Sequence, residues 1–152
     1  MSGPAHFQPA DPANPANNAR RTQLLHLRVG AAALFGFAAL GVVLESLHAF
    51  KAPWYLGVAG ESRRLLFTLA HAHGVALGLV NLAFAATAHL LPRRAHPAAS
   101  LALIVATILI PGGFFLGGLF AHGGDPGLGA ILIPPGALFL LVSLALFVRA
   151  SR

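Results

Sequence analysis

Four apolar runs of about the length of a membrane-spanning helix restrict what this chain can fold into. None of them contains Asp, Glu, Lys or Arg, and the first is long enough only when extended to Phe50, which brings in Glu45 and His48. Lipid offers no partners for backbone N–H and C=O groups, so only helices or closed barrels span it. The runs lack the strict alternation of barrel strands, and we therefore predict an all-α fold, a four-helix transmembrane bundle. The helices are expected at residues 27–50, 64–91, 98–120 and 127–148.

Composition supports a membrane protein. Charged residues make up 9% of the 152 residues, and 57% are hydrophobic. Soluble domains average about 25% charged residues, so this chain cannot cover a water-facing surface. The net charge of +6 is attributed to membrane orientation, and the absence of a long basic run interleaved with aromatic side chains argues against nucleic acid as a partner. The chain has no cysteine, which excludes disulfides, thiolate catalysis and cysteine-based metal sites.

The links between the runs are short, which predicts an up-down-up-down order of the helices. Seven Lys and Arg then fall on the side of the two termini and three on the other, so both termini are expected in the cytoplasm. Residues 1–22, rich in Pro, Ala and Asn, are expected to form a disordered cytoplasmic tail before a membrane domain of residues 23–152. Arg outnumbers Lys nine to one, which indicates a bacterial gene and hence the inner membrane.

Glu45 is the only acidic residue well inside an apolar segment. A charge there costs about 2.5–3.5 kcal/mol on insertion scales, and such residues often mark functional sites. His48 lies three residues on, and so on the same helical face. His71 is expected at a matching depth on the second helix, and His122 follows the third helix on the same side. We therefore predict one cluster near the outer face, made of Glu45, His48, His71 and His122.

One face of the second helix carries His71, Gly74, Gly78 and Asn81. Gly74-x-x-x-Gly78 is a small-residue spacing of the kind that brings membrane helices together, so this face is expected to meet a partner helix. On a structural interpretation, Glu45, His71 and Asn81 form a polar lock between helices.

The cluster also has two functional interpretations. Glu45 with His48, His71 and His122 would bind a metal ion, or His48 and His71 would hold a haem. Alternatively, Glu45 would carry protons or a substrate, with the sequences ILIPGG at 108–113 and ILIPPG at 131–136 breaking the last two helices as in transporters. A di-iron carboxylate centre is not expected, because too few further acidic residues are present.

The remaining histidines are assigned no function. His73 is expected on a lipid-facing or packing face, and His26, His89 and His96 near the cytoplasmic interface. The sequence contains no nucleophile elbow, P-loop or H-E-x-x-H motif, so no catalytic residue is named and the protein is not expected to be an enzyme.

Two segments, ESLHAFKAPWYL at 45–56 and RRLLFTLAHAHGVALGLVNLAFA at 63–85, resemble small multi-pass proteins of bacterial inner membranes. That resemblance covers the four helices and implies a membrane location without a particular activity. The His-x-His at 71–73 is similar to segments of haem-copper-oxidase-like membrane subunits. The further haem and copper histidine helices of that family are missing from this sequence.

The sequence thus predicts a non-catalytic integral membrane protein whose Glu/His cluster binds a metal ion or haem or stabilises the bundle. A small transporter or proton-coupled channel is one alternative. Another is an accessory or assembly subunit. The expected partners of the protein are the lipid bilayer and either further copies of the chain or a larger membrane complex.

Overall fold

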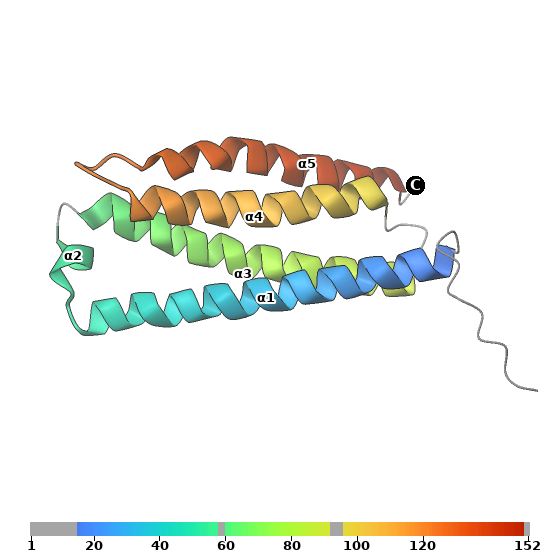
Figure 1. The fold of residues 1–152 in the computed structure, drawn as a ribbon, viewed down its shortest axis with the longest axis horizontal. Coiled ribbons are helices and arrows are strands. Elements are labelled where there is room, and N and C mark those ends of the chain that lie inside the picture. Colours follow the sequence, from blue (N-terminus) through green and yellow to red (C-terminus); the bar gives the residue numbers. More distant parts are fainter. Residues whose placement is uncertain (1–14, 58–59, 92–95, 151–152) are drawn as a thin grey trace, which may run out of the picture.

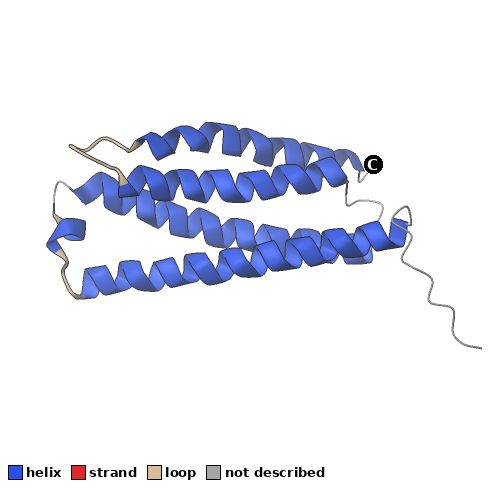
Figure 2. Ribbon diagram, viewed as in Figure 1, coloured by secondary structure: helices blue, strands red, loops and turns tan. Residues whose placement is uncertain are grey.

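The computed structural model describes residues 15–57, 60–91 and 96–150, and in these ranges it forms helices and no strand (Figures 1 and 2). The all-α prediction is confirmed. The elements are α1 (Pro15–Ala49), α2 (Pro53–Leu56), α3 (Glu61–Leu90), α4 (Pro97–Leu119), the 3-10 helix η3 (Leu128–Leu132) and α5 (Ile133–Ala150). Four spans are long and apolar enough to cross a membrane, namely α1 from Asn17, α3, α4, and η3 together with α5. This is consistent with an integral membrane protein.

α3 and α4 form the middle of the bundle, with α1 packed mainly on α3 and α5 mainly on α4. The most apolar windows of α3 and α4 are 39% and 50% buried, whereas those of α1 and α5 are 11% buried each. The flanking helices therefore carry broad exposed apolar faces. The links after α1 and after α4 lie together on the left in Figure 1, here called the α2 end, and the C-terminus lies at the opposite, terminal end.

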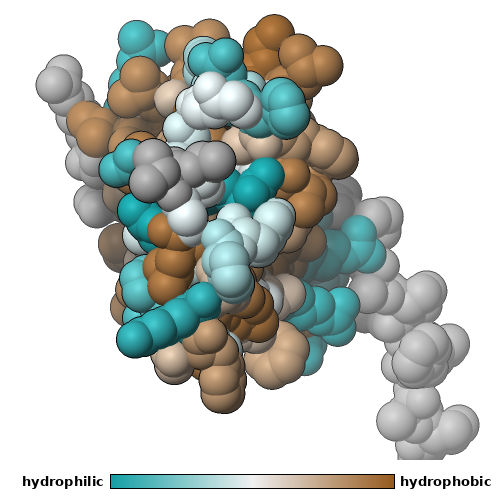
Figure 3. Space-filling view, turned by 90° about the vertical axis from the view of Figure 1, so that its left-hand side faces the viewer, coloured by the Kyte–Doolittle hydropathy of each residue, from teal (hydrophilic) through white to brown (hydrophobic). Residues whose placement is uncertain are grey.

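Polar residues gather at the α2 end. Figure 3 looks onto this end and shows hydrophilic side chains among the hydrophobic ones. The three basic residues near it in the described chain are Lys51, Arg63 and Arg64. Arg63 and Arg64 are half-buried, while Lys51 is exposed and adopts a left-handed backbone conformation with a φ of 51°. The link between α1 and α3 contains the short helix α2, which was not predicted from the sequence.

α1 begins at Pro15, inside the segment expected to be disordered. Proline is favoured at the first position of a helix, where its missing N–H has no helical partner. The Ala, Arg, Gln and Leu residues that follow are good helix formers and continue the helix into the first apolar run. Residues 15–22 are therefore helical, and the rest of the predicted tail, residues 1–14, lies outside the described residues.

The sequence predicted a proline break in each of the last two spans, and the structure has a break in only one of them. α4 runs without interruption through Pro111, which is fully buried, so the expected break in this helix is wrong. In the last span the break is present, because η3 ends at Leu132 and α5 begins just before Pro134 and Pro135. The missing N–H groups of these two prolines fall in the first turn of α5, where a helix leaves such groups unpaired.

α1 and α3 approach each other closely along a seam of small residues. A Cβ atom at Gly74 would overlap the ring of Phe37, and one at Gly78 would lie 3.0 Å from Cγ of Leu34. On the other side, a Cβ at Gly30 would lie 2.8 Å from the carbonyl oxygen of Gly78. The spacing Gly74-x-x-x-Gly78 thus places two glycines of α3 against α1.

Candidate functional site

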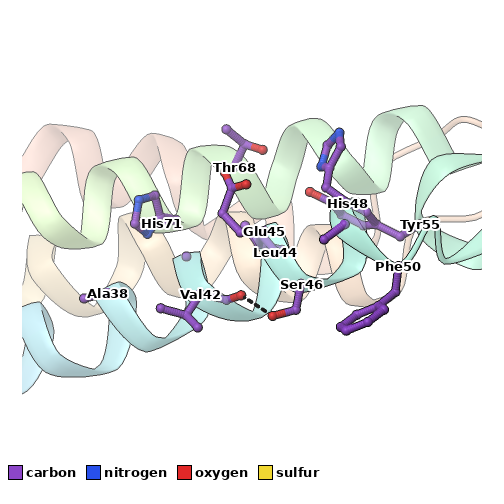
Figure 4. Close-up of a pocket in the computed structure, with 12 residues that line it drawn as sticks. Ala38, Val42, Leu44, Glu45, Ser46, His48, Phe50, Tyr55, Thr68 and His71 are labelled. Carbon is purple, nitrogen blue, oxygen red and sulfur yellow. Dashed lines mark hydrogen bonds between the residues drawn. The ribbon is translucent and has the colours of Figure 1, made fainter.

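A cavity of about 850 Å³ lies at the α2 end, between α1, α2 and α3 (Figure 4). Its polar lining comes from Glu45, Ser46 and His48 of α1, Tyr55 of α2, and Thr68 and His71 of α3. The cavity is a widely open groove, since most of its lining residues are exposed. It is called the outer pocket below, after the membrane side expected for it. Its remaining lining residues are Ala38, Gly41, Val42, Leu44, Ala49 and Phe50.

The outer pocket brings together three of the four residues expected to cluster. In Figure 4 the Glu45 side chain reaches from α1 toward α3, between His71 on one side and His48 on the other. Glu45 and His48 are exposed and His71 is half-buried. Glu45 makes no hydrogen bond or ion pair with another described residue, so its charge is not compensated within that part of the chain.

The imidazole of His71 is held by the backbone of α1. Its Nδ1 lies 2.6 Å from the carbonyl oxygen of Phe37. A carbonyl oxygen only accepts, so Nδ1–H donates, and in the neutral ring Nε2 keeps a free lone pair. Gly41 makes room for the ring, because a Cβ there would lie 2.8 Å from Nδ1. Histidines that bind metals or protons are commonly oriented in this way by a bond to the other nitrogen.

Two of the three hydroxyl groups of the outer pocket, those of Ser46 and Thr68, also donate their hydrogens to backbone carbonyls. Ser46 Oγ donates to the carbonyl oxygen of Val42 at 2.8 Å, and Thr68 Oγ1 donates to that of Arg64 at 2.9 Å. Each oxygen keeps lone pairs that can accept. Together with the Glu45 carboxylate and Nε2 of His71, these oxygens give the pocket four groups that can accept, beside the Tyr55 hydroxyl and the His48 ring.

α2 is held in place by Arg63, and this positions Tyr55 in the pocket wall. The guanidinium donates to the carbonyl oxygens of Trp54 (3.3 Å) and Ala121 (2.9 Å), and it lies 4.7 Å from the centre of the Trp54 ring. Tyr55 is 1% exposed, and its ring meets that of His48 edge-on at 5.5 Å. One arginine of α3 thus links α2 to the end of α4 and shapes one side of the cavity.

His122 lies apart from the outer pocket. It is exposed, in the turn after α4, and it exchanges backbone hydrogen bonds with Asp125 at 3.0 and 3.1 Å. Gly123 and Gly124 allow this tight turn because both adopt positive φ angles, 61° and 92°. Among the described residues, no group of three or more His, Asp or Glu side chains is placed to hold a metal ion. The structure thus gathers Glu45, His48 and His71 without arranging them as metal ligands.

A second polar group lies buried nearer the terminal end, between α1, α3 and α4. His26 and Asn81 are fully buried, and their side chains meet with Nδ1 of His26 2.7 Å from Oδ1 of Asn81. Nε2 of His26 lies 2.8 Å from Oγ of Ser100, and Nδ2 of Asn81 donates to Oγ1 of Thr107 at 2.8 Å. We call these four residues the buried network. The polar lock expected for Asn81 is thus made with His26 and Thr107, and not with Glu45 or His71.

The buried network has one consistent pattern of donors. Nδ2 of Asn81 also donates to the carbonyl oxygen of Leu77 at 2.8 Å, which fixes the orientation of the amide. Oδ1 therefore faces His26 as an acceptor, so Nδ1–H of His26 donates and Nε2 accepts from the Ser100 hydroxyl. Thr107 passes its own hydrogen to the carbonyl oxygen of Leu103 at 2.7 Å. Each member is satisfied, which suits a stabilising link between three helices.

The position of His26 in the buried network was not predicted, although the sequence carries a signal for it. His26 continues a stripe on α1 with steps of four, four and three residues, through Gly30, Leu34 and Phe37. The last three contact α3 at Gly78 or Gly74. Extending that stripe toward the N-terminus places His26 on the same inward face.

The outer pocket and the buried network are separated by a closed layer. Between His71 and Asn81 on α3, the ring of Phe37 lies over Gly74, and Leu34 lies against Gly78. His73 falls in the same stretch but turns to α4, where its ring lies 4.8 Å from that of Phe114. Between α1 and α3, these contacts close the outer pocket toward the terminal end, while a smaller open pocket beside Phe37 lies between α1 and α4.

Comparison of this chain with protein-family models, with curated proteins and with solved structures finds no match. The interpretation of the site accordingly rests on its own residues and their chemistry.

Proposed function

We propose that this chain is a non-catalytic integral membrane protein that binds a cation in the outer pocket, with Glu45 and His71 as the principal recognising side chains. The observation that carries this proposal is the set of acceptors facing one cavity. The hydrogens of His71 Nδ1, Ser46 and Thr68 are all donated to backbone carbonyls, which leaves lone pairs and the Glu45 carboxylate toward the ligand.

Charge supports a cation over an anion or a neutral ligand. An ionised carboxylate in or near lipid is costly, and Glu45 has no cationic partner among the described residues. A bound cation would supply that partner, and Coulomb attraction is several times stronger beside a low-dielectric surrounding than in water. An anion would meet the carboxylate and acceptor lone pairs.

A metal ion or a haem is one form that this cation site can take. A metal ion would draw Glu45, His48 and His71 together, and His71 with His48 would hold a haem iron through their ring nitrogens. Metal analysis and a visible spectrum of the purified protein test these two forms directly. Bound metal that is lost in His71→Ala would support the first, and a Soret band the second.

The closed layer at Phe37 and Gly74 favours binding over passage through the bundle. A channel or transporter that uses Glu45 would need a route past this layer. If reconstituted vesicles carry a flux that Glu45→Gln abolishes, the transport alternative replaces the proposal.

Replacing Glu45 with glutamine should weaken cation binding at least tenfold, because the only carboxylate of the pocket loses its charge while its size is kept. Tenfold corresponds to about 1.4 kcal/mol. Detergent-solubilised protein is titrated with a panel of divalent metal ions and alkylammonium ions, and the thermal unfolding midpoint is followed. At least one cation should raise the midpoint of the wild type and not that of Glu45→Gln.

Glu61→Gln is the matched control, since Glu61 is an exposed carboxylate at the start of α3 and is not part of the pocket lining. It should bind as the wild type does. Equal losses in both variants, or a panel in which no cation stabilises the wild type, would count against the proposal.

A further inference from the structure

We propose that the outer pocket takes a primary ammonium group carried on an apolar body, that is, an amphipathic primary amine. This inference rests on the proposed cation site and specifies its ligand.

Three acceptors between α1 and α3 can serve the three N–H donors of a primary ammonium group. They are the Glu45 carboxylate, Nε2 of His71 and Oγ1 of Thr68. In Figure 4 the Glu45 carboxylate lies next to Thr68 and between the two histidines, so that the groups come from α1 and α3 at adjacent levels. A quaternary ammonium has no N–H to donate, and a hydroxyl has only one.

The size of the cavity fits an organic molecule better than a bare ion. Small-molecule pockets commonly enclose about 300–1,000 Å³, and the outer pocket measures about 850 Å³. A transition metal needs ligand atoms at about 2.0–2.3 Å around one point. The described His, Asp and Glu side chains do not form such a group.

The pocket has a polar side and an apolar side. Glu45, Thr68 and His71 lie between α1 and α3, whereas Ala38, Val42 and Phe50 line α1 beside them (Figure 4). Val42 on α1 and Phe50 directly after it are 67% and 85% exposed, beside the outer face of α1, which is available to lipid. A ligand with an ammonium head and a hydrocarbon tail satisfies both sides, and it can enter from the lipid.

Three probes share one eight-carbon tail and differ in their head group, so a comparison of their binding shows which head group the pocket recognises. They are n-octylamine, octyltrimethylammonium and 1-octanol, with Zn²⁺ as a fourth probe. Trp54 is the only tryptophan of the chain and lies on α2 next to Tyr55, so its fluorescence reports binding together with the thermal midpoint. We expect n-octylamine to bind the wild type at least tenfold more tightly than the other three probes do. This preference should disappear in Glu45→Gln. Because each probe enters detergent equally with either protein, the comparison of the two proteins removes the effect of partition into detergent.

Thr68→Val tests the third acceptor and should weaken n-octylamine binding about threefold to tenfold, with octyltrimethylammonium unchanged. Thr87→Val is the matched control, because Thr87 Oγ1 also donates to a carbonyl four residues back on α3, at 3.0 Å from Ala83 O, but lies outside the pocket. Unchanged midpoints of the ligand-free variants show that they fold.

Equal binding of n-octylamine and octyltrimethylammonium would overturn the primary-amine inference and leave the cation site standing. Tighter binding of Zn²⁺, lost in His71→Ala, would overturn it in favour of a metal site. Absence of binding by all charged probes would remove the proposed function as well.

Discussion

Gly74→Ala should destabilise the protein by about 1–3 kcal/mol, the usual cost of overfilling a packed interior. A Cβ atom at this position would overlap the Phe37 ring, and the α1–α3 contact would have to open to admit it. The atoms that a Cβ would meet are Cγ, Cδ1 and Cδ2 of Phe37, near the base of the ring, so the side chain cannot relieve the overlap by moving only its far end. The measurement is the thermal midpoint in detergent, with far-ultraviolet circular dichroism as a check of helix content.

Gly36→Ala and Gly112→Ala provide matched controls within membrane-spanning helices. A Cβ at either position meets nothing within 4 Å, and alanine is the better helix former. Both variants should therefore be as stable as the wild type or slightly more stable. A further variant, Gly74→Ala with Phe37→Leu, should recover part of the loss. If Gly74→Ala melts like Gly36→Ala, the close approach of α1 and α3 is not what holds these helices together.

Asn81→Leu should destabilise the protein by about 1–3 kcal/mol, because it leaves the buried Nδ1–H of His26 without an acceptor. Hydrogen bonds between membrane helices average only about 0.6 kcal/mol. The larger figure applies here because His26 is fully enclosed and cannot turn to water or to another partner. The unfolding midpoint in detergent is again the measure.

Thr107→Val tests the same network with a smaller change. Thr107 and Thr87 both donate to a carbonyl four residues back, but only Thr107 also accepts from Asn81. Thr107→Val should therefore lower the midpoint more than Thr87→Val. Equal midpoints for these two variants, together with a stable Asn81→Leu protein, would mean that the network contributes little to stability.

The four spans could be predicted because hydrophobic length alone determines them. The errors lie where length is not the deciding quantity. α2 has only four residues, too few to show a helical period. The start of α1 depends on Pro15 and the helix formers after it, which lie in sequence that resembles a disordered tail. Pro111 is accommodated inside α4, and nothing in its apolar neighbourhood distinguishes it from the proline pair that starts α5.

The candidate site was predictable where depth along a helix determines position. Glu45, His48 and His71 line one cavity because they lie at matching levels on two adjacent helices. His122 does not, because the direction of its side chain depends on the Gly123–Gly124 turn and not on a helix. The partners of Asn81 could not be inferred from charge, since the buried network is made of uncharged polar side chains from three helices. Ser100 and Thr107 share one face of α4 at a spacing of seven, and this is the signal that could have found them.

The closed layer at Phe37 and Gly74 also limits how far a bound charge can enter the electric field of the membrane. Glu45 lies four residues before the end of α1 at Ala49, which is about 6 Å at 1.5 Å per residue. If α1 ends at the membrane boundary, this is about a fifth of a hydrocarbon core of roughly 30 Å. A full crossing changes the energy of one charge by about 2.3 kcal/mol per 100 mV. The energy of a cation held by Glu45 therefore changes by about 0.5 kcal/mol per 100 mV of membrane potential. Occupancy of the pocket should therefore be set by ligand concentration far more than by membrane voltage.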